Sequence, residues 1–208
     1  MTARVPVIAV FVSGTGRTLR HLFEMTNSQQ LLAKIGVVVA SRECLAIEWA
    51  REQGLAVEKV RGDESGSELE STLEKHGAGW VVLAGYTRLV PVMPSYEYRV
   101  VNIHPALLPD FGGKGMYGTR VHRAVLESGA TQSGCTVHLC DDRYDTGPIV
   151  AQSVCDVQTG DTPETLAARV FERELDLYPR ALASLFAGFK VVKGRVELSQ
   201  PVLGARSR

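Results

Sequence analysis

The sequence predicts an α/β fold in which a mostly parallel, twisted sheet has helices on both faces and antiparallel strands are added in the C-terminal half. In the first half, short β-branched apolar runs alternate with stretches of helical periodicity, which is typical of parallel strands joined by right-handed crossovers. A glycine turn follows the first of these runs. Farther along, two segments separated by a short polar turn alternate in period two, as antiparallel strands do. The expected arrangement is Rossmann-like.

Length and composition indicate one globular domain. The chain has 208 residues, of which 45% are hydrophobic and 22% are charged, enough to bury one good core and short for two. We expect a single domain over residues 1–199 and a flexible tail at 200–208.

Charge and cysteine usage exclude several classes of function. The net charge is +0 and the pI is about 7.0, so no overall basic field attracts nucleic acid or an anionic membrane. The apolar run Val5–Val12 is too short to cross a membrane, and no signal-peptide pattern is present. The cysteines Cys44, Cys135, Cys140 and Cys155 lack metal-ligand spacing and fit free thiols in a reducing compartment. We therefore expect a cytoplasmic protein without a metal.

The first half of the sequence predicts four strands with helices between them. The expected helices run through Leu19–Met25, through Cys44–Gly54 and through Leu69 to about Gly77, with a polar loop at 61–66. The expected strands are Val5–Val12, Ile35–Ala40, Ala56–Val60 and Trp80–Gly85.

The second half predicts further strands and two helices. Thr119 is expected to cap a helix that ends near Ser128, and Thr162 with Pro163 to start a long helix reaching Gly188. Pro179 should kink or divide that helix. The expected strands are Val100–His104, Gly134–Cys140, Ile149–Val157 and a terminal hairpin at Phe189–Leu198.

Two polar side chains stand where the Val100–His104 strand ends. Asn102 and His104 project to one face because side chains alternate along a strand, and Pro105 stops the ladder. An amide can stabilise an oxyanion and an imidazole can transfer a proton near pH 7. Both could equally be satisfied by neighbouring backbone. His138, a rival imidazole within a strand, is interpreted as structural.

The turn Ser13–Thr18 joins a strand to a helix, which aims backbone N–H groups at an anion. A dinucleotide fingerprint is incomplete, because Leu19 replaces the third glycine and Ser41-Arg42 replaces the acidic residue. Arg42 could suit the 2′-phosphate of NADP, and a Walker A lysine is absent. The turn is either a generic phosphate cradle or a tight turn without a ligand.

Two other segments could contact a ligand. Arg88 leaves the end of the fourth strand, where it could bind a carboxylate, a phosphate or a heterocycle, or be a solvated surface arginine. The glycine-rich segment Asp110–Gly118 is interpreted as a mobile loop suited to a lid, or as a linker.

Four motifs occur together and in order: Ser13–Gly16, Val82–Arg88, Asn102–Pro109 and Tyr144–Ile149. On these motifs the chain resembles the folate-dependent formyltransferases over about residues 5 to 187. At this length, it is most similar to the branch that formylates glycinamide ribonucleotide in purine synthesis.

The resemblance implies an activity and roles for three residues. The formyl group of 10-formyltetrahydrofolate, a co-substrate, passes to the amine of glycinamide ribonucleotide and leaves tetrahydrofolate. Asn102 donates a hydrogen bond to the developing oxyanion, His104 stabilises it and transfers protons, and Asp145 orients His104. No metal is implied.

The resemblance also assigns binding residues. Arg17-Thr18 stands where many members have Ser-Asn, the loop Phe111–Tyr117 is longer than in many members, and no folate-tail ligand is assigned from residues 61–67. The implied ribonucleotide-binding residues are Gly14, Thr15, Gly16, Arg17, Thr18 and Glu174, and the implied folate-binding residues are Thr87, Arg88, Leu89, Val90, Asp141 and Tyr144.

Other functions stay open at this point. A formyltransferase could use an amino sugar nucleotide or an aminoacyl-tRNA, but those enzymes usually carry a further C-terminal domain. A formyltetrahydrofolate hydrolase usually has an N-terminal regulatory domain. A non-catalytic nucleotide-binding module is a different class. The expected partners are small molecules, without nucleic acid or membrane, and a homodimer is an open alternative to a monomer.

Overall fold

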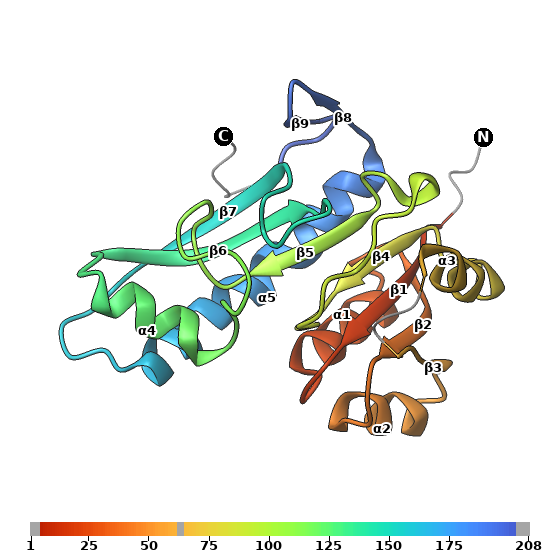
Figure 1. Cartoon of the computed structure of the whole chain (residues 1–208), viewed down its shortest axis with the longest axis horizontal. Coiled ribbons are helices and arrows are strands. Elements are labelled where there is room, and N and C mark those ends of the chain that lie inside the picture. Colours follow the sequence, from red (N-terminus) through yellow and green to blue (C-terminus); the bar gives the residue numbers. More distant parts are fainter. Residues whose placement is uncertain (1–4, 62–64, 203–208) are drawn as a thin grey trace. The chain divides into compact units, whose positions relative to one another are not determined.

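The computed structural model describes residues 5–61 and 65–202. The chain divides after Asn102 into two compact units, whose helices and strands are labelled in Figure 1. That residues 1–199 act as one domain stays a prediction. Residues 62–64 of the expected polar loop and 203–208 of the expected tail lie outside the described residues.

The first unit contains parallel strands in the order β3-β2-β1-β4-β5, the last of which runs on into the second unit. The intervening helices are α1 (Arg17–Asn27), α2 (Leu45–Glu52), α3 (Gly66–Lys75) and the 3-10 helix η1 (Pro94–Tyr96). The strands are β1 (Val7–Val12), β2 (Lys34–Ala40), β3 (Val57–Lys59), β4 (Trp80–Leu83) and β5 (Val100–His104).

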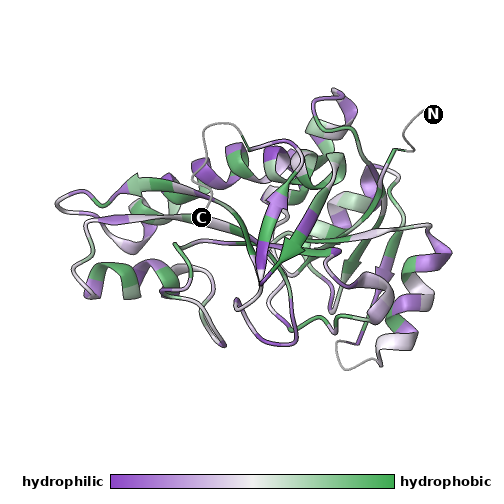
Figure 2. Cartoon of the chain, turned by 90° about the horizontal axis from the view of Figure 1, so that it is seen from above, coloured by the Kyte–Doolittle hydropathy of each residue, from purple (hydrophilic) through white to green (hydrophobic). Residues whose placement is uncertain are grey.

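The core of the first unit forms around β1 and β4. Ile8, Val10 and Val12 have no exposed surface, and neither do Val81 and Val82. Figure 2, coloured by hydropathy, shows green hydrophobic stretches in strands as well as in helices. A strand buried on both sides needs apolar residues at every position rather than every second one. This is why the nearly continuous β-branched runs predicted the parallel strands correctly.

The second unit is built on an antiparallel pair, β6 (Gln132–Leu139) and β7 (Ile149–Asp156). Helix α5 (Pro163–Ala187) packs against both strands and against α4 (Thr119–Glu127). The hairpin of β8 (Phe189–Val192) and β9 (Arg195–Leu198) turns through Lys193 and Gly194, which both have positive φ angles, as a two-residue hairpin turn requires. The antiparallel pair and the terminal hairpin confirm the prediction.

Two details of the helices differ from the prediction. Gly118, not Thr119, precedes α4, and no side chain caps that helix. Helix α5 continues through Pro179 as one element of 25 residues, although proline in a helix costs about 3 kcal/mol. Leu177, Tyr178 and Leu182 are buried on either side of Pro179, so packing keeps the helix in one piece. No helix in the described ranges is long and apolar enough to cross a membrane.

A buried hydrogen-bond network fixes the segment that follows β5. The hydroxyl of Thr136 donates to the carbonyl of Ala106 at 2.7 Å and accepts from the N–H of Leu108 at 3.0 Å. The amide of Gln152 donates to the carbonyl of Leu108 and to the Thr136 hydroxyl, both at 2.9 Å. Side chains from β6 and β7 thus provide hydrogen-bond partners for the buried N–H and C=O groups of the irregular backbone that follows His104.

Helix α4 places a histidine in the interior of the second unit. The side chain of His122 is 4% exposed, and its Nδ1 has no hydrogen-bond partner among the described residues. Burial, and to a smaller extent the charge of the nearby His104 imidazole, lowers the pKa of His122 to about 4. His122 is therefore neutral when the protein is folded near pH 7.

We predict that Thr136→Val destabilises the protein. Valine has a similar shape but leaves the N–H of Leu108 and the carbonyl of Ala106 without their partner, which should lower the free energy of unfolding by roughly 2–4 kcal/mol. Urea unfolding followed by circular dichroism measures this change. The matched control Thr159→Val, at an exposed turn position, should change stability by less than about 0.5 kcal/mol. Equal effects of the two substitutions would contradict the importance of the network.

We predict that His122 makes stability depend on pH. Because its pKa is lower in the folded than in the unfolded protein, the unfolded chain binds more protons as the pH falls from about 6.5 toward about 4, and stability falls over that window. His122→Leu should flatten this dependence without removing the smaller share that His104 contributes. Urea titrations at several pH values between 7.5 and 4 test it, and parallel curves for the two proteins would refute it.

Candidate functional site

Strand β5 carries the two polar side chains that the sequence singled out. Asn102 and His104 stand two positions apart on it, so they lie on the same face. Asn102 is partly exposed, whereas His104 is only 3% exposed. The imidazole is therefore held in the interior, where its contacts with neighbouring groups decide its protonation.

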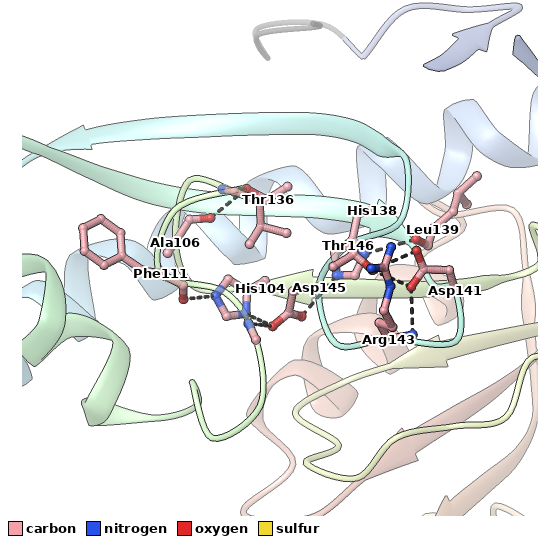
Figure 3. A network of polar contacts seen from close by, with 12 residues as sticks. His104, Ala106, Phe111, Thr136, His138, Leu139, Asp141, Arg143, Asp145 and Thr146 are labelled. Atoms are coloured by element: carbon pink, nitrogen blue, oxygen red, sulfur yellow. Dashed lines mark hydrogen bonds and ion pairs between the residues drawn. The ribbon is translucent and has the colours of Figure 1, made fainter. Parts of the chain in front are cut away.

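Acceptor groups flank both ring nitrogens of His104 (Figure 3). Its Nε2 lies 2.9 Å from the carbonyl oxygen of Phe111, and its Nδ1 lies 3.5 Å from Oδ2 of Asp145. A carbonyl oxygen only accepts, so Nε2 carries a proton. The structure thus brings His104 and Asp145 together, which is the pairing that the family resemblance implied.

The carboxylate of Asp145 is enclosed by partners. Asp145 lies between β6 and β7 with a left-handed backbone (φ 59°), and its side chain is 9% exposed. The N–H of Gly113 donates to Oδ2 at 2.9 Å. On the other side, Nε2 of His138 lies 3.5 Å from Oδ1. One carboxylate therefore contacts two imidazoles and a loop peptide.

Burial and these partners set the protonation of the pair. Burial lowers the pKa of His104, while the charge of Asp145 and the hydrogen bond to Phe111 work in the opposite direction without cancelling it. For Asp145, burial raises the pKa, but the hydrogen bond from His138, the charge of His104 and the N–H of Gly113 together bring it below its usual value. Asp145 is consequently charged near neutral pH.

Sequence reasoning missed the contact between His138 and Asp145. The β6–β7 register shifts between Val137 and His138, and such a bulge re-aims a side chain. Nδ1 of His138 lies 3.1 Å from the carbonyl oxygen of Leu139, so the ring is held between this carbonyl and the Asp145 carboxylate. Nothing in the sequence marks the bulge, although a histidine in a strand next to an acidic turn was a usable signal.

The carboxylate of Asp141 accepts hydrogen bonds from other residues of its own turn, the one that follows β6. Asp141 accepts from the N–H of Arg143 at 3.0 Å and from the hydroxyl of Thr146 at 2.8 and 2.9 Å (Figure 3). Tyr144 is partly exposed in the same turn. Asp141 therefore shapes the turn that carries Asp145, as acidic side chains commonly do in turns.

Glu174 lies on α5, partly exposed. Burial raises the pKa of the Cys135 thiol on β6, and the Glu174 carboxylate raises it further. The glutamate is therefore close to the β6 strand rather than fully solvated.

In the first unit, the glycine turn leads into α1. Gly14, Thr15 and Arg17 are exposed, Thr18 is partly exposed, and Gly16 is buried. Gly16 precedes the helix in a left-handed conformation (φ 78°), and a Cβ there would lie 2.8 Å from Cβ of Ala46. No side chain caps α1 and its first turn holds no acidic residue, which suits an anion at this end.

The segment after β4 lies beside this turn. The N–H of Thr87 donates to the hydroxyl of Ser13 at 3.2 Å. Arg88 donates to the carbonyl of Arg61 at 2.6 Å, so its guanidinium is tied to the neighbouring backbone. Leu89 is 41% exposed and Val90 is buried. Both belong to a small apolar hollow, whose lining residues are Phe11, Val60, Leu69, Tyr86, Leu89, Val90 and Pro91.

Metal ligands are not gathered anywhere in the two described ranges. No group of three or more His, Cys, Asp or Glu side chains there could hold a metal ion. Within the same ranges, all four cysteines are free thiols; Cys135 and Cys155 are buried, whereas Cys44 and Cys140 are partly exposed.

Known proteins resemble this chain closely. A phosphoribosylglycinamide formyltransferase, chloroplastic, from Arabidopsis thaliana is 43% identical over 188 residues, which cover 86% of this chain and 64% of that protein. The chain thus spans slightly less than two thirds of that relative's length. Two crystal structures are also similar to it. Phosphoribosylglycinamide formyltransferase from Brucella melitensis is 35% identical with a TM-score of 0.77, and the match covers 89% of this chain and 97% of that one. Glycinamide ribonucleotide transformylase 1 from Symbiobacterium toebii is 29% identical with a TM-score of 0.85, and the match covers 96% of this chain and 100% of that one.

A family model described as formyl transferase matches residues 7–182. The match covers the glycine turn, strand β5 and the turn that carries Asp145. The chain therefore belongs to the formyl transferase family.

Proposed function

We propose that this protein transfers the formyl group of 10-formyltetrahydrofolate to the amine of glycinamide ribonucleotide. The products are formylglycinamide ribonucleotide and tetrahydrofolate, a step of purine synthesis. The observation that carries the proposal is the buried pair of His104 and Asp145 (Nδ1 to Oδ2, 3.5 Å) directly after Asn102 on one strand. Relatives named phosphoribosylglycinamide formyltransferase support the choice of acceptor.

The chemistry requires an oxyanion to be stabilised and protons to move. The neutral amine attacks the formyl carbon, and negative charge develops on the formyl oxygen. The amine must then lose a proton, and the folate nitrogen must gain one before it leaves. In this proposal, the amide of Asn102 donates to the oxyanion, and a donor of this kind is typically worth roughly 3 kcal/mol in the transition state.

His104 suits the role of moving protons because hydrogen-bond acceptors flank both of its ring nitrogens. Phe111 O accepts from Nε2, and Asp145 lies on the side of Nδ1. Two acceptors favour the imidazolium, whereas burial favours the neutral ring. In this proposal the imidazolium form stabilises the oxyanion through its charge, and Nε2 exchanges its hydrogen bond to Phe111 O for one to the reactants when it transfers a proton.

Asp145 would act through His104. Its carboxylate keeps one ring orientation and stabilises the positive charge, and it stays ionised because His138, His104 and Gly113 N–H outweigh the effect of burial. We therefore add His138 to the three residues expected from the motifs, Asn102, His104 and Asp145. Its role is to hold the Asp145 carboxylate.

The remaining assignments are proposals for binding. The ribonucleotide phosphate would contact the backbone of Gly14–Thr18 at the uncapped start of α1, and Glu174 would bind the ribonucleotide. Folate would contact the segment Thr87–Val90 and the turn of Asp141 and Tyr144. A cytoplasmic location, a single domain over residues 1–199, a homodimer as an alternative to a monomer, and no nucleic-acid or membrane partner complete the proposal.

We predict that loss of 10-formyltetrahydrofolate requires glycinamide ribonucleotide. A spectrophotometric assay with the donor or a dideaza analogue, run with and without the ribonucleotide, measures this. Donor loss only in the presence of the ribonucleotide supports both substrate assignments. Loss without it would indicate a hydrolase. No loss by a folded protein that binds folate would indicate another amine acceptor, and no folate binding would favour a non-catalytic module.

We predict that His104→Ala and Asp145→Asn each lower kcat by about 100-fold or more, because the first removes the proton-transferring group and the second its counter-charge. Steady-state kinetics of the transfer reaction measure the change. The control His76→Ala removes an imidazole that pairs with Glu58 in the first unit and should keep kcat within about twofold. Wild-type kcat in both site variants would show that the catalytic site lies elsewhere.

A further inference from the structure

The turn Phe111–Gly113 touches both members of the pair with its backbone. The carbonyl oxygen of Phe111 lies 2.9 Å from Nε2 of His104, and the N–H of Gly113 donates to Oδ2 of Asp145 at 2.9 Å. A segment of three residues thus supplies an acceptor to one group and a donor to the other.

We propose that this turn is a positioning element for catalysis and that Gly112 is the residue that permits it. The inference rests on the proposed function: the turn orients Asp145 through a charge-assisted hydrogen bond, and Asp145 in turn orients His104. The turn itself supplies no group to the reaction.

The backbone of the turn is held in an uncommon conformation. Phe111 has a φ of 56°, in the left-handed region that residues other than glycine seldom adopt. Gly113 also has a positive φ, at 103°. Such strain persists only when surrounding contacts hold it, and the two hydrogen bonds to the His104–Asp145 pair are contacts of that kind.

Gly112 leaves no room for a side chain. A Cβ at this position would lie 2.6 Å from Cδ2 of Leu108 and 3.1 Å from Cβ of Asp145. Leu108 is 2% exposed, and its backbone is fixed by Thr136 and Gln152, so it yields poorly. A side chain at this position would therefore require either buried Leu108 or the turn beside the carboxylate to shift.

The position of Gly112 also explains why the turn acts on Asp145 in particular. The two closest obstacles to a Cβ are the side chain of Asp145 and the leucine that follows the His104 strand. Glycine allows the peptide of residues 112 and 113 to approach until its N–H reaches Oδ2. At the same time, His138 contacts Oδ1, so the carboxylate is fixed at both oxygens.

The first test is Gly112→Ala in the full chain. It should lower kcat about 10-fold to 100-fold, the typical range for losing a hydrogen bond to a charged group, while KM for either substrate changes by less than about threefold. The matched control is Gly79→Ala, because a Cβ at Gly79 has open space around it. A kcat for Gly112→Ala within twofold of the control overturns the proposal.

The double-mutant cycle separates positioning from a general structural role. If the turn acts through Asp145, Gly112→Ala should change kcat by less than about twofold in the background of Asp145→Ala. The same 10-fold or larger loss in both backgrounds overturns the proposal, because it shows that Asp145 does not transmit the effect.

A measurement without substrates distinguishes a failure of the positioning turn from a failure of the proposed function, and it requires no Gly112 variant. In ligand-free wild-type protein labelled with ¹⁵N, the backbone N–H of Gly113 should be protected from exchange by Oδ2 of Asp145, and this protection should be lost in Asp145→Ala. If this N–H is not protected in the wild-type protein, the positioning turn is overturned. If it is protected but formyl transfer is not detected, only the proposed reaction fails.

Discussion

The candidate site depends on keeping the Asp145 carboxylate charged in a mostly buried position. A buried carboxylate without partners would take up a proton rather than stay ionised. Asp145 avoids this because His104, His138 and the N–H of Gly113 all contact it, from two strands and a loop. Since these partners come from segments far apart in sequence, the charge is maintained only when the second unit is folded.

Glycines at two close approaches bring these segments together. A Cβ at Gly147 would lie 1.9 Å from the carbonyl oxygen of Leu139, and one at Gly134 would lie 2.0 Å from that of Ser153. A side chain at Gly147 would disturb the backbone next to the turn that carries Asp145, and one at Gly134 would separate the β6–β7 pair toward its other end. The bulge at His138 then directs an imidazole at the carboxylate. Backbone proximity, more than side-chain packing, therefore determines the geometry of the site.

The sequence predicted those features that short-range rules govern. Alternation along a strand placed Asn102 and His104 on one face, and the Thr162-Pro163 pair correctly marked the start of α5. Asp145 was assigned to His104 through family resemblance, and the structure brings the two together. The bulge before His138, the use of Asp141 within its own turn and the continuity of α5 through Pro179 all arise from tertiary contacts, which single-sequence patterns do not contain.

The glycine turn of the first unit illustrates why a motif alone does not assign a function. Gly16 is required by packing, because a Cβ would meet Ala46 at 2.8 Å, so a glycine would stand here with or without a ligand. What favours an anion is a different observation: α1 begins without a side-chain cap and without an acidic residue in its first turn. In α3, by contrast, Ser65 and Glu68 form a capping box. Helix α5 also begins with a side-chain cap, at Thr162, whereas α4 begins without one. An uncapped start therefore suits a phosphate but does not by itself assign one, and at α1 it is the combination with the glycine turn that favours an anion.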